Sequence, residues 1–182
     1  MNSDIRLREQ LIEAWRHRAL LDMQIWRTLR DEIGSARAEA LLKQAQFAHG
    51  HSVGTRFKKF APGDLHGLAD AFLSSLPGEG RLFDPQVIHC DSQRLEIRLR
   101  RTPWLSAWRE AGDGEAEVET LAGIAAAMWA GAIKGAGFRF VGESWKRGGG
   151  DDSHVLHIER ASPSHPEDRH HDHPAAPRRR AA

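Results

Sequence analysis

The spacing of the apolar residues changes along the chain, and this change constrains the fold more than any other feature of the sequence. Up to Leu76 apolar residues recur every three or four positions, which is the period of an α-helix. From Leu95 to Arg100 every second residue is apolar, as in a strand that buries one face and leaves the other wet. We therefore expect helices in the first half and a sheet built from later segments.

Three helices are predicted in the first half of the chain. The first covers Asp4–Ile33 and ends at a glycine. Ser35 is a suitable N-cap for the second helix, which should weaken around Gly50–Gly54. Asp64 can cap the third, which the Pro77–Gly78 pair stops.

Two hairpins are predicted in the second half, separated by two helices. Val87–Cys90 and Leu95–Arg100 form the first hairpin, and Phe138–Trp145 and Ser153–Glu159 form the second around a glycine-rich turn. Glu115–Lys134 is an alanine-rich helix whose small residues should allow close packing against the sheet. The expected fold class is α+β, with a helical N-terminal half packed on a small antiparallel sheet.

One α+β domain is expected over residues 1–160, followed by a disordered tail over residues 161–182. The tail is rich in His, Arg and Pro and has no apolar period, so it cannot bury enough surface to offset the entropy of ordering. Its histidines could bind a metal ion weakly, without a fixed coordination geometry: His165, His170, His171 and His173.

Composition excludes several classes of protein. The chain has 26 Lys and Arg against 25 Asp and Glu, so its net charge of +1 gives no overall attraction to nucleic acid or to a membrane surface. Cys90 is the only cysteine, which excludes an internal disulfide and a cysteine-based zinc cluster. The longest apolar run, Ile124–Ile133, is shorter than the ~20 residues of a membrane span. We expect a soluble, cytoplasmic protein.

The stretch RRTPWLSAWREAG, residues 100–112, predicts a short helix. Thr102 is a favoured N-cap, Pro103 suits the first helical position, and Gly112 ends the helix. Trp104 and Trp108 then share one face, where both rings can be explained as packing. Alternatively, Thr102, Trp104 and Trp108 face a pocket in which the helix N-terminus binds a substrate carboxylate.

Asp151, Asp152 and His154 lie together at the last predicted hairpin turn. A carboxylate beside an imidazole could activate a water molecule as general base, although acidic residues after glycines are also ordinary turn residues. His154 and His157 should point to opposite faces of their strand, so no metal site is expected in the folded part. No P-loop or Rossmann fingerprint is present, and no cofactor is expected.

The chain resembles the L-2-amino-thiazoline-4-carboxylic acid hydrolase family of bacterial proteins over most of residues 10–160. The resemblance lies in the helical segment Glu32–Leu42, the charged strand that leads into Pro103, Trp108 before a glycine, and the terminal hairpin. The family commonly has a cysteine at the position of Thr102 and a second near Val155. Both are absent here, which excludes cysteine-dependent catalysis at these positions.

The resemblance implies a hydrolase that opens a small cyclic thiazoline-type or amidine amino acid. In this hypothesis Asp152 and His154 activate water, while Thr102, Trp104 and Trp108 contact the substrate. The alternative is a small-ligand-binding or regulatory module without catalysis, which the missing cysteines and the lack of a complete catalytic constellation favour. The order of strands and helices also resembles the ligand-binding domains of the vinyl-reductase type. Similar architecture does not fix function.

Overall fold

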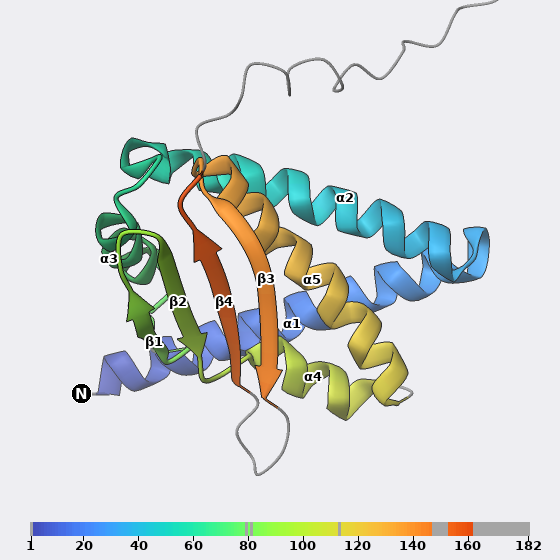
Figure 1. Ribbon diagram of the computed structural model, residues 1–182. Coiled ribbons are helices and arrows are strands. Elements are labelled where there is room, and N and C mark those ends of the chain that lie inside the picture. The colour runs from blue at the N-terminus through green and yellow to red at the C-terminus, as the bar shows by residue number, and fades with distance from the viewer. Residues whose placement is uncertain (1, 79, 81, 113, 147–152, 162–182) are drawn as a thin grey trace, which may run out of the picture.

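The computed structural model (Figure 1) describes residues 2–78, 80, 82–112, 114–146 and 153–161. Its helices are α1 (Asn2–Ile33), α2 (Ser35–Gly54), the 3-10 helix η1 (Thr55–Phe60), α3 (Leu65–Ser75), α4 (Pro103–Ala111) and α5 (Glu115–Gly135). Its strands are β1 (Pro85–Cys90), β2 (Arg94–Leu99), β3 (Arg139–Lys146) and β4 (Ser153–Glu159). This order confirms the predicted α+β class.

The four strands form one antiparallel sheet in the order β1-β2-β4-β3. The two predicted hairpins therefore join side by side, because β4 pairs with β2 as well as with β3. A bulge interrupts β3 between Phe140 and Gly142. The pairing of β2 with β4 places residues about 60 positions apart in the sequence next to each other, as in the pair Glu96 and His157.

The two faces of the sheet differ in chemistry. The alternate side chains that point to the inner face are fully buried: Leu95, Ile97, Leu99, Leu156 and Ile158. Helices α1 and α5 pass behind this face, and α3 lies beside β1 and β2 (Figure 1). No described helix covers the outer face, where the intervening residues of β2 and β4 are polar or half-buried.

Helix α3 begins and buries its apolar face as the sequence predicts. The carboxylate of Asp64 accepts a hydrogen bond from the Gly67 amide at 2.8 Å, which satisfies one of the amides that a helix start leaves unpaired. Leu65, Leu68 and Phe72 are buried in the core.

The prediction that Ser35 caps α2 is wrong. Gly34 is the N-cap, with φ of 82°, and Ser35 is the first helical residue. The Gly34 amide donates to the Arg30 carbonyl at 2.9 Å, and its carbonyl accepts from Ala38 at 3.0 Å. One glycine thus ends α1 and starts α2, because the reversal needs a positive φ that a residue with a side chain rarely adopts.

Helix α2 does not weaken at Gly50–Gly54 as predicted but continues to Gly54. A Cβ on Gly50 would lie 2.0 Å from the Met128 carbonyl oxygen, and one on Gly131 would lie 2.1 Å from the Phe47 oxygen. The glycines therefore permit backbone contact between α2 and α5. The small residues of α5 serve this helix pair, in addition to the contact with the sheet that we expected.

Helix α5 has the length and composition of a membrane span, which corrects the expectation drawn from the shorter apolar run. Several of its large apolar side chains are buried within the fold: Val118, Leu121, Ile124, Trp129 and Ile133. This is the pattern of a core helix.

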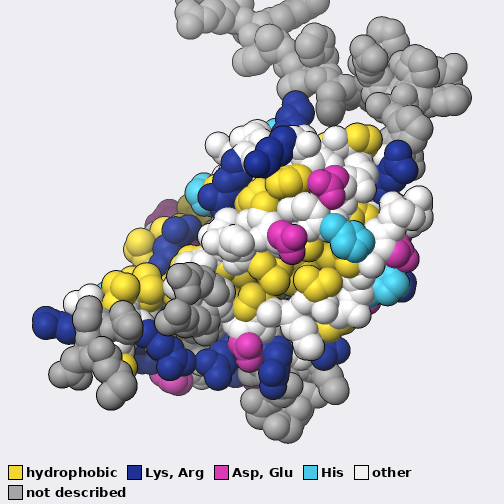
Figure 2. Space-filling view, turned by 90° about the vertical axis from the view of Figure 1, so that its left-hand side faces the viewer, with side chains coloured by type: hydrophobic (Ala, Val, Ile, Leu, Met, Phe, Trp, Pro, Cys, Tyr) yellow, Lys and Arg dark blue, Asp and Glu magenta, His cyan; other side chains and the backbone are white. Residues whose placement is uncertain are grey.

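Charge is unevenly distributed over the surface although the net charge is only +1. Figure 2 shows the side of the molecule that lies at the left of Figure 1. Lys and Arg side chains run along its lower edge, and hydrophobic side chains lie between charged groups in its centre. A local basic region can therefore attract an anion that the chain as a whole would not.

Candidate functional site

The start of α4 has the predicted backbone but not the predicted cap. Thr102 occupies the N-cap position, and its carbonyl oxygen accepts from the Leu105 amide at 2.9 Å. The Thr102 side chain makes no capping hydrogen bond, so that part of the prediction is wrong. Pro103 occupies the first turn as expected. Thr102 instead lines a recess in front of the helix.

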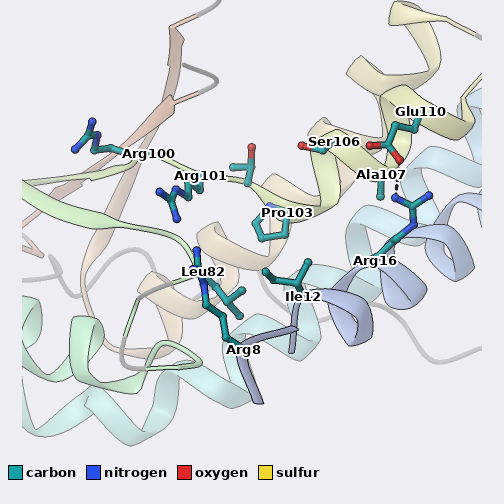
Figure 3. A pocket seen from close by; sticks show the side chains of 11 residues that line it. Arg8, Ile12, Arg16, Leu82, Arg100, Arg101, Pro103, Ser106, Ala107 and Glu110 are labelled. Atoms are coloured by element: carbon teal, nitrogen blue, oxygen red, sulfur yellow. Dashed lines mark hydrogen bonds and ion pairs between the residues drawn. The ribbon is translucent and has the colours of Figure 1, made fainter. Parts of the chain in front are cut away.

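This recess has a volume of about 370 Å³ and joins three parts of the chain (Figure 3). Helix α1 contributes Arg8, Ile12 and Arg16, and Leu82 comes from the segment before β1. The end of β2 and the first turns of α4 supply the remaining lining residues: Arg100, Arg101, Thr102, Pro103, Ser106, Ala107 and Glu110. We call it the arginine recess.

Four arginines and one glutamate give the arginine recess a positive charge. Arg16 is paired with Glu110, with 2.5 Å between Nη1 and Oε2. Arg100 lies 3.5 Å from the carboxylate of Asp84. In Figure 3 Arg8 and Arg101 lie across the recess from the Arg16–Glu110 pair.

Arg8 and Arg101 make no ion pair with any residue that the structure describes, and both are exposed. The main chain holds Arg101 in place, because its amide donates to the Phe83 carbonyl at 3.0 Å. Two guanidinium groups are thus left to bind an anion, and the start of α4 adds the positive end of a helix dipole.

The two tryptophans of α4 lie away from the arginine recess. Trp108 is 2 % exposed, and its indole nitrogen donates to the Ala19 carbonyl of α1 at 2.8 Å. Trp104 packs between Trp15 and Phe83, with ring centroids 5.8 and 5.6 Å apart. Both rings therefore pack in the core, which is the first of the two explanations given for them above.

Trp104 and Trp108 also border a smaller cavity of about 100 Å³ between α1, α2, α4 and α5. Trp15 and Trp129 complete its aromatic wall, and Asp22 lies at its rim, paired with Arg18. The structure thus separates the three predicted contact residues. Thr102 lines the arginine recess, whereas the tryptophans line this aromatic cavity.

The predicted catalytic pair is only half described, because Asp152 lies outside the described residues. His154 lies in β4 and has no exposed surface. Its burial lowers the pKa to about 4, because a charged imidazole loses its hydration in the core. His154 is not among the residues that line the arginine recess.

Among the residues that the structure describes, no group of three or more His, Cys, Asp or Glu side chains is arranged to bind a metal. The histidine cluster of residues 165–173 lies outside this part of the chain, so the prediction of weak metal binding there is not addressed. His154 and His157 do point to opposite faces of β4, as strand geometry requires.

Sequence reasoning missed the arginines of the recess. Arg100 and Arg101 stand just before a predicted helix start. The sequence does not show that Arg8 and Arg16, which share one face of α1, lie against this helix start. Their spacing of eight residues was the available signal, since it places both on the same side of the helix. Only the packing of α1 on α4 brings the two sets together.

Comparison of the chain with protein-family models, with curated proteins and with solved structures finds no match. The family resemblance described above therefore stays a prediction.

Proposed function

We propose that the protein binds a small molecule bearing a carboxylate in the arginine recess. The observation that carries this proposal is the convergence of four arginines on one recess, where two of them lack a carboxylate partner among the described residues. Guanidinium groups bind carboxylates through two parallel hydrogen bonds, which makes arginine the residue suited to this task.

The size and lining of the recess fit a compact ligand. Its volume of about 370 Å³ lies in the range of small-molecule sites, roughly 300–1,000 Å³. Ile12, Leu82 and Pro103 supply apolar contacts, while Thr102 and Ser106 supply hydroxyls. A ligand with one anionic end and a small ring carrying heteroatoms would use both kinds of wall.

A second candidate function is hydrolysis of a cyclic thiazoline-type amino acid, as the family resemblance suggests. Its carboxylate would bind to Arg8 and Arg101, and among the described lining residues Glu110 alone carries a carboxylate. Glu110 would accept a proton as water adds to the ring carbon, and would pass that proton to the ring heteroatom that is released when its bond to that carbon breaks. We place either function in the cytoplasm, because a chain whose only cysteine is Cys90 suits a reducing compartment.

The binding proposal is tested by isothermal titration calorimetry with 2-aminothiazoline-4-carboxylate on the full chain. Arg8→Gln and Arg101→Gln should each weaken binding about tenfold, because a hydrogen bond to a charged group contributes about 1.5–3 kcal/mol. Arg37→Gln is the matched control, since it removes an exposed arginine of α2 outside the recess. Equal affinities for all three variants and the native chain would contradict the proposal.

Hydrolysis is tested separately by following the mass of the same compound during incubation. Ring opening adds one water, and Glu110→Gln should abolish it while leaving the compound bound. Unchanged substrate in a preparation that binds the compound would rule out the reaction and keep the binding function.

A further inference from the structure

A nucleophilic constellation lies on the outer face of the sheet, apart from the arginine recess. The Ser144 hydroxyl of β3 lies 2.8 Å from Nε2 of His157 in β4. The other ring nitrogen of His157, Nδ1, lies 3.2 Å from the Glu96 carboxylate of β2. The histidine thus connects a serine with an acid, Nε2 facing the hydroxyl and Nδ1 facing the carboxylate. Acyl transfer by an activated serine requires the same arrangement.

The register of the strands explains this geometry. Glu96, His157 and Gly142 are direct cross-strand partners in one row, so the acid and the imidazole meet side by side. Ser144 lies two residues further along β3 than Gly142, on the same face of the sheet and opposite Val155. It therefore contacts His157 diagonally across the two strands. The order of the strands in the sheet, in which β4 lies between β2 and β3, brings these three strands together.

The three side chains differ in exposure as their roles require. Ser144 is exposed, the His157 side chain is 30 % exposed and the Glu96 side chain only 17 %. The nucleophile can therefore meet a substrate, whereas the acid is partly shielded and holds the imidazole. A carboxylate on Nδ1 keeps the proton there, so that Nε2 is the acceptor for the serine proton.

Space for an acyl group exists beside the histidine. Gly142 has no side chain to cover its partner His157, and a Cβ built on it would have no atom within 4 Å. The bulge at this point of β3 adds to the opening. Arg98 lies in the row of Ser144, two strands away, which is roughly 10 Å between main chains and within reach of an arginine side chain.

We propose that Ser144, His157 and Glu96 form a second, nucleophilic site that accepts an acyl group from an ester. Ser144 Oγ gives its proton to His157 Nε2 as it bonds to the carbonyl carbon, and Arg98 stabilises the oxyanion. The carbon–oxygen bond to the leaving group then breaks, and the alcohol leaves with the proton from Nε2. Water repeats the sequence on the acyl-serine, which releases the acid and restores the Ser144 hydroxyl.

The alternative is that these contacts only strengthen the sheet as cross-strand polar pairs. A purely structural network would not make Ser144 reactive. Reactivity of the serine therefore separates the two explanations.

A fluorophosphonate ester and p-nitrophenyl acetate are suitable probes on the full chain. The serine oxygen displaces fluoride from the phosphonate, and the adduct is located by peptide mass spectrometry. We expect one adduct, on Ser144, which Ser144→Ala removes completely. His157→Gln should slow labelling at least about 100-fold, the lower end of the general-base contribution.

Ser74→Ala is the matched control, because Ser74 is an exposed serine of α3 that lies outside both sites and donates only to the Asp70 carbonyl of its own helix. Circular dichroism confirms that each variant is folded. No adduct on native protein, or labelling that persists in folded Ser144→Ala or is unchanged in His157→Gln, would overturn the proposal.

Discussion

The arginine recess and the outer face of the sheet divide between them features that hydrolytic sites usually combine. The recess encloses about 370 Å³ and carries positive charge, but neither cysteine nor histidine is found among the described residues that line it. The outer face carries a serine, a histidine and an acid in hydrogen-bond contact, on an open surface. The recess thus has the enclosure that ligand binding needs, and the outer face has the hydrogen-bonded side chains that a nucleophilic site needs.

The two histidines of β4 show how the fold decides which groups are available for chemistry. His154 and His157 are three residues apart and therefore point to opposite faces. The core encloses His154, whereas His157 stays accessible between Ser144 and Glu96. We therefore expect changes in the recess and changes on the outer face to act independently.

Reversing one charge in the recess should have the largest effect. Arg101→Glu removes a cation that contacts the ligand and adds a repelling anion, so we expect binding of the thiazoline carboxylate to weaken about 100-fold or more. Labelling of Ser144 should not change. Calorimetry and mass spectrometry on the same preparation measure both, with Arg37→Glu as control. A parallel loss of labelling would show that the regions are not independent.

Acid should destabilise the protein through His154, and the sign follows from its pKa. Burial holds that pKa at about 4 in the folded chain, against 6.5 for an ordinary imidazole. Between these values the unfolded chain binds the extra proton, so stability falls as the pH falls through this window. The loss from pH 7 to pH 5 is about 2 kcal/mol.

Urea unfolding of native protein and of His154→Leu at pH 7 and pH 5 measures this loss. In His154→Leu the free energy of unfolding should differ much less between pH 7 and pH 5 than it does in the native protein. Asp91 does not interfere, because backbone hydrogen bonds from Gln93 and Arg94 lower its pKa to about 2, outside this range. The same dependence in both chains would show that another group is responsible.

Removing the charge of the acid on the outer face should have a smaller effect. Glu96→Gln keeps the size of the side chain but no longer favours the proton on Nδ1 of His157, so we expect phosphonate labelling to slow at least about tenfold. Because Glu96 acts through the histidine, Glu96→Asp, which keeps the carboxylate, should retain more of the labelling rate than Glu96→Gln. Binding in the recess should stay unchanged, and an unaltered labelling rate in Glu96→Gln would remove Glu96 from the site.

Salt should produce the smallest difference. Raising sodium chloride from about 20 mM to about 500 mM screens exposed charges and should weaken carboxylate binding several-fold. The rate at which an uncharged phosphonate labels Ser144 should change by less than about twofold. The groups that take part in this reaction are in direct contact, so salt screens their interaction little. Calorimetry and labelling rates at both concentrations give the comparison. Salt-insensitive binding would mean that the exposed arginines contribute little.

Periodicity was sufficient to predict the α-helices and the strands of this fold, but not the 3-10 helix η1. The apolar stripe after Asp64 gave α3 together with its cap, and the alternation of Leu95, Ile97 and Leu99 gave β2 and its buried face. These features depend on local spacing, which the sequence shows directly. The end of α2 was misjudged because Gly50 acts through contact with another helix, which is a tertiary property.

The candidate sites were less predictable for the same reason. The recess joins Arg8 to Arg101, and the outer-face site joins Glu96 to His157, so both depend on packing between distant segments. Sequence proximity instead suggested His154, which the register of β4 turns into the core.

A matched pair of ligands tests whether the arginine recess binds a carboxylate. Calorimetry of the full chain at low salt compares 2-aminothiazoline-4-carboxylate with its uncharged carboxamide, which has nearly the same shape. We predict that the carboxylate binds at least about tenfold more tightly. Equal affinity for the two compounds, or no binding of the carboxylate, would contradict the account.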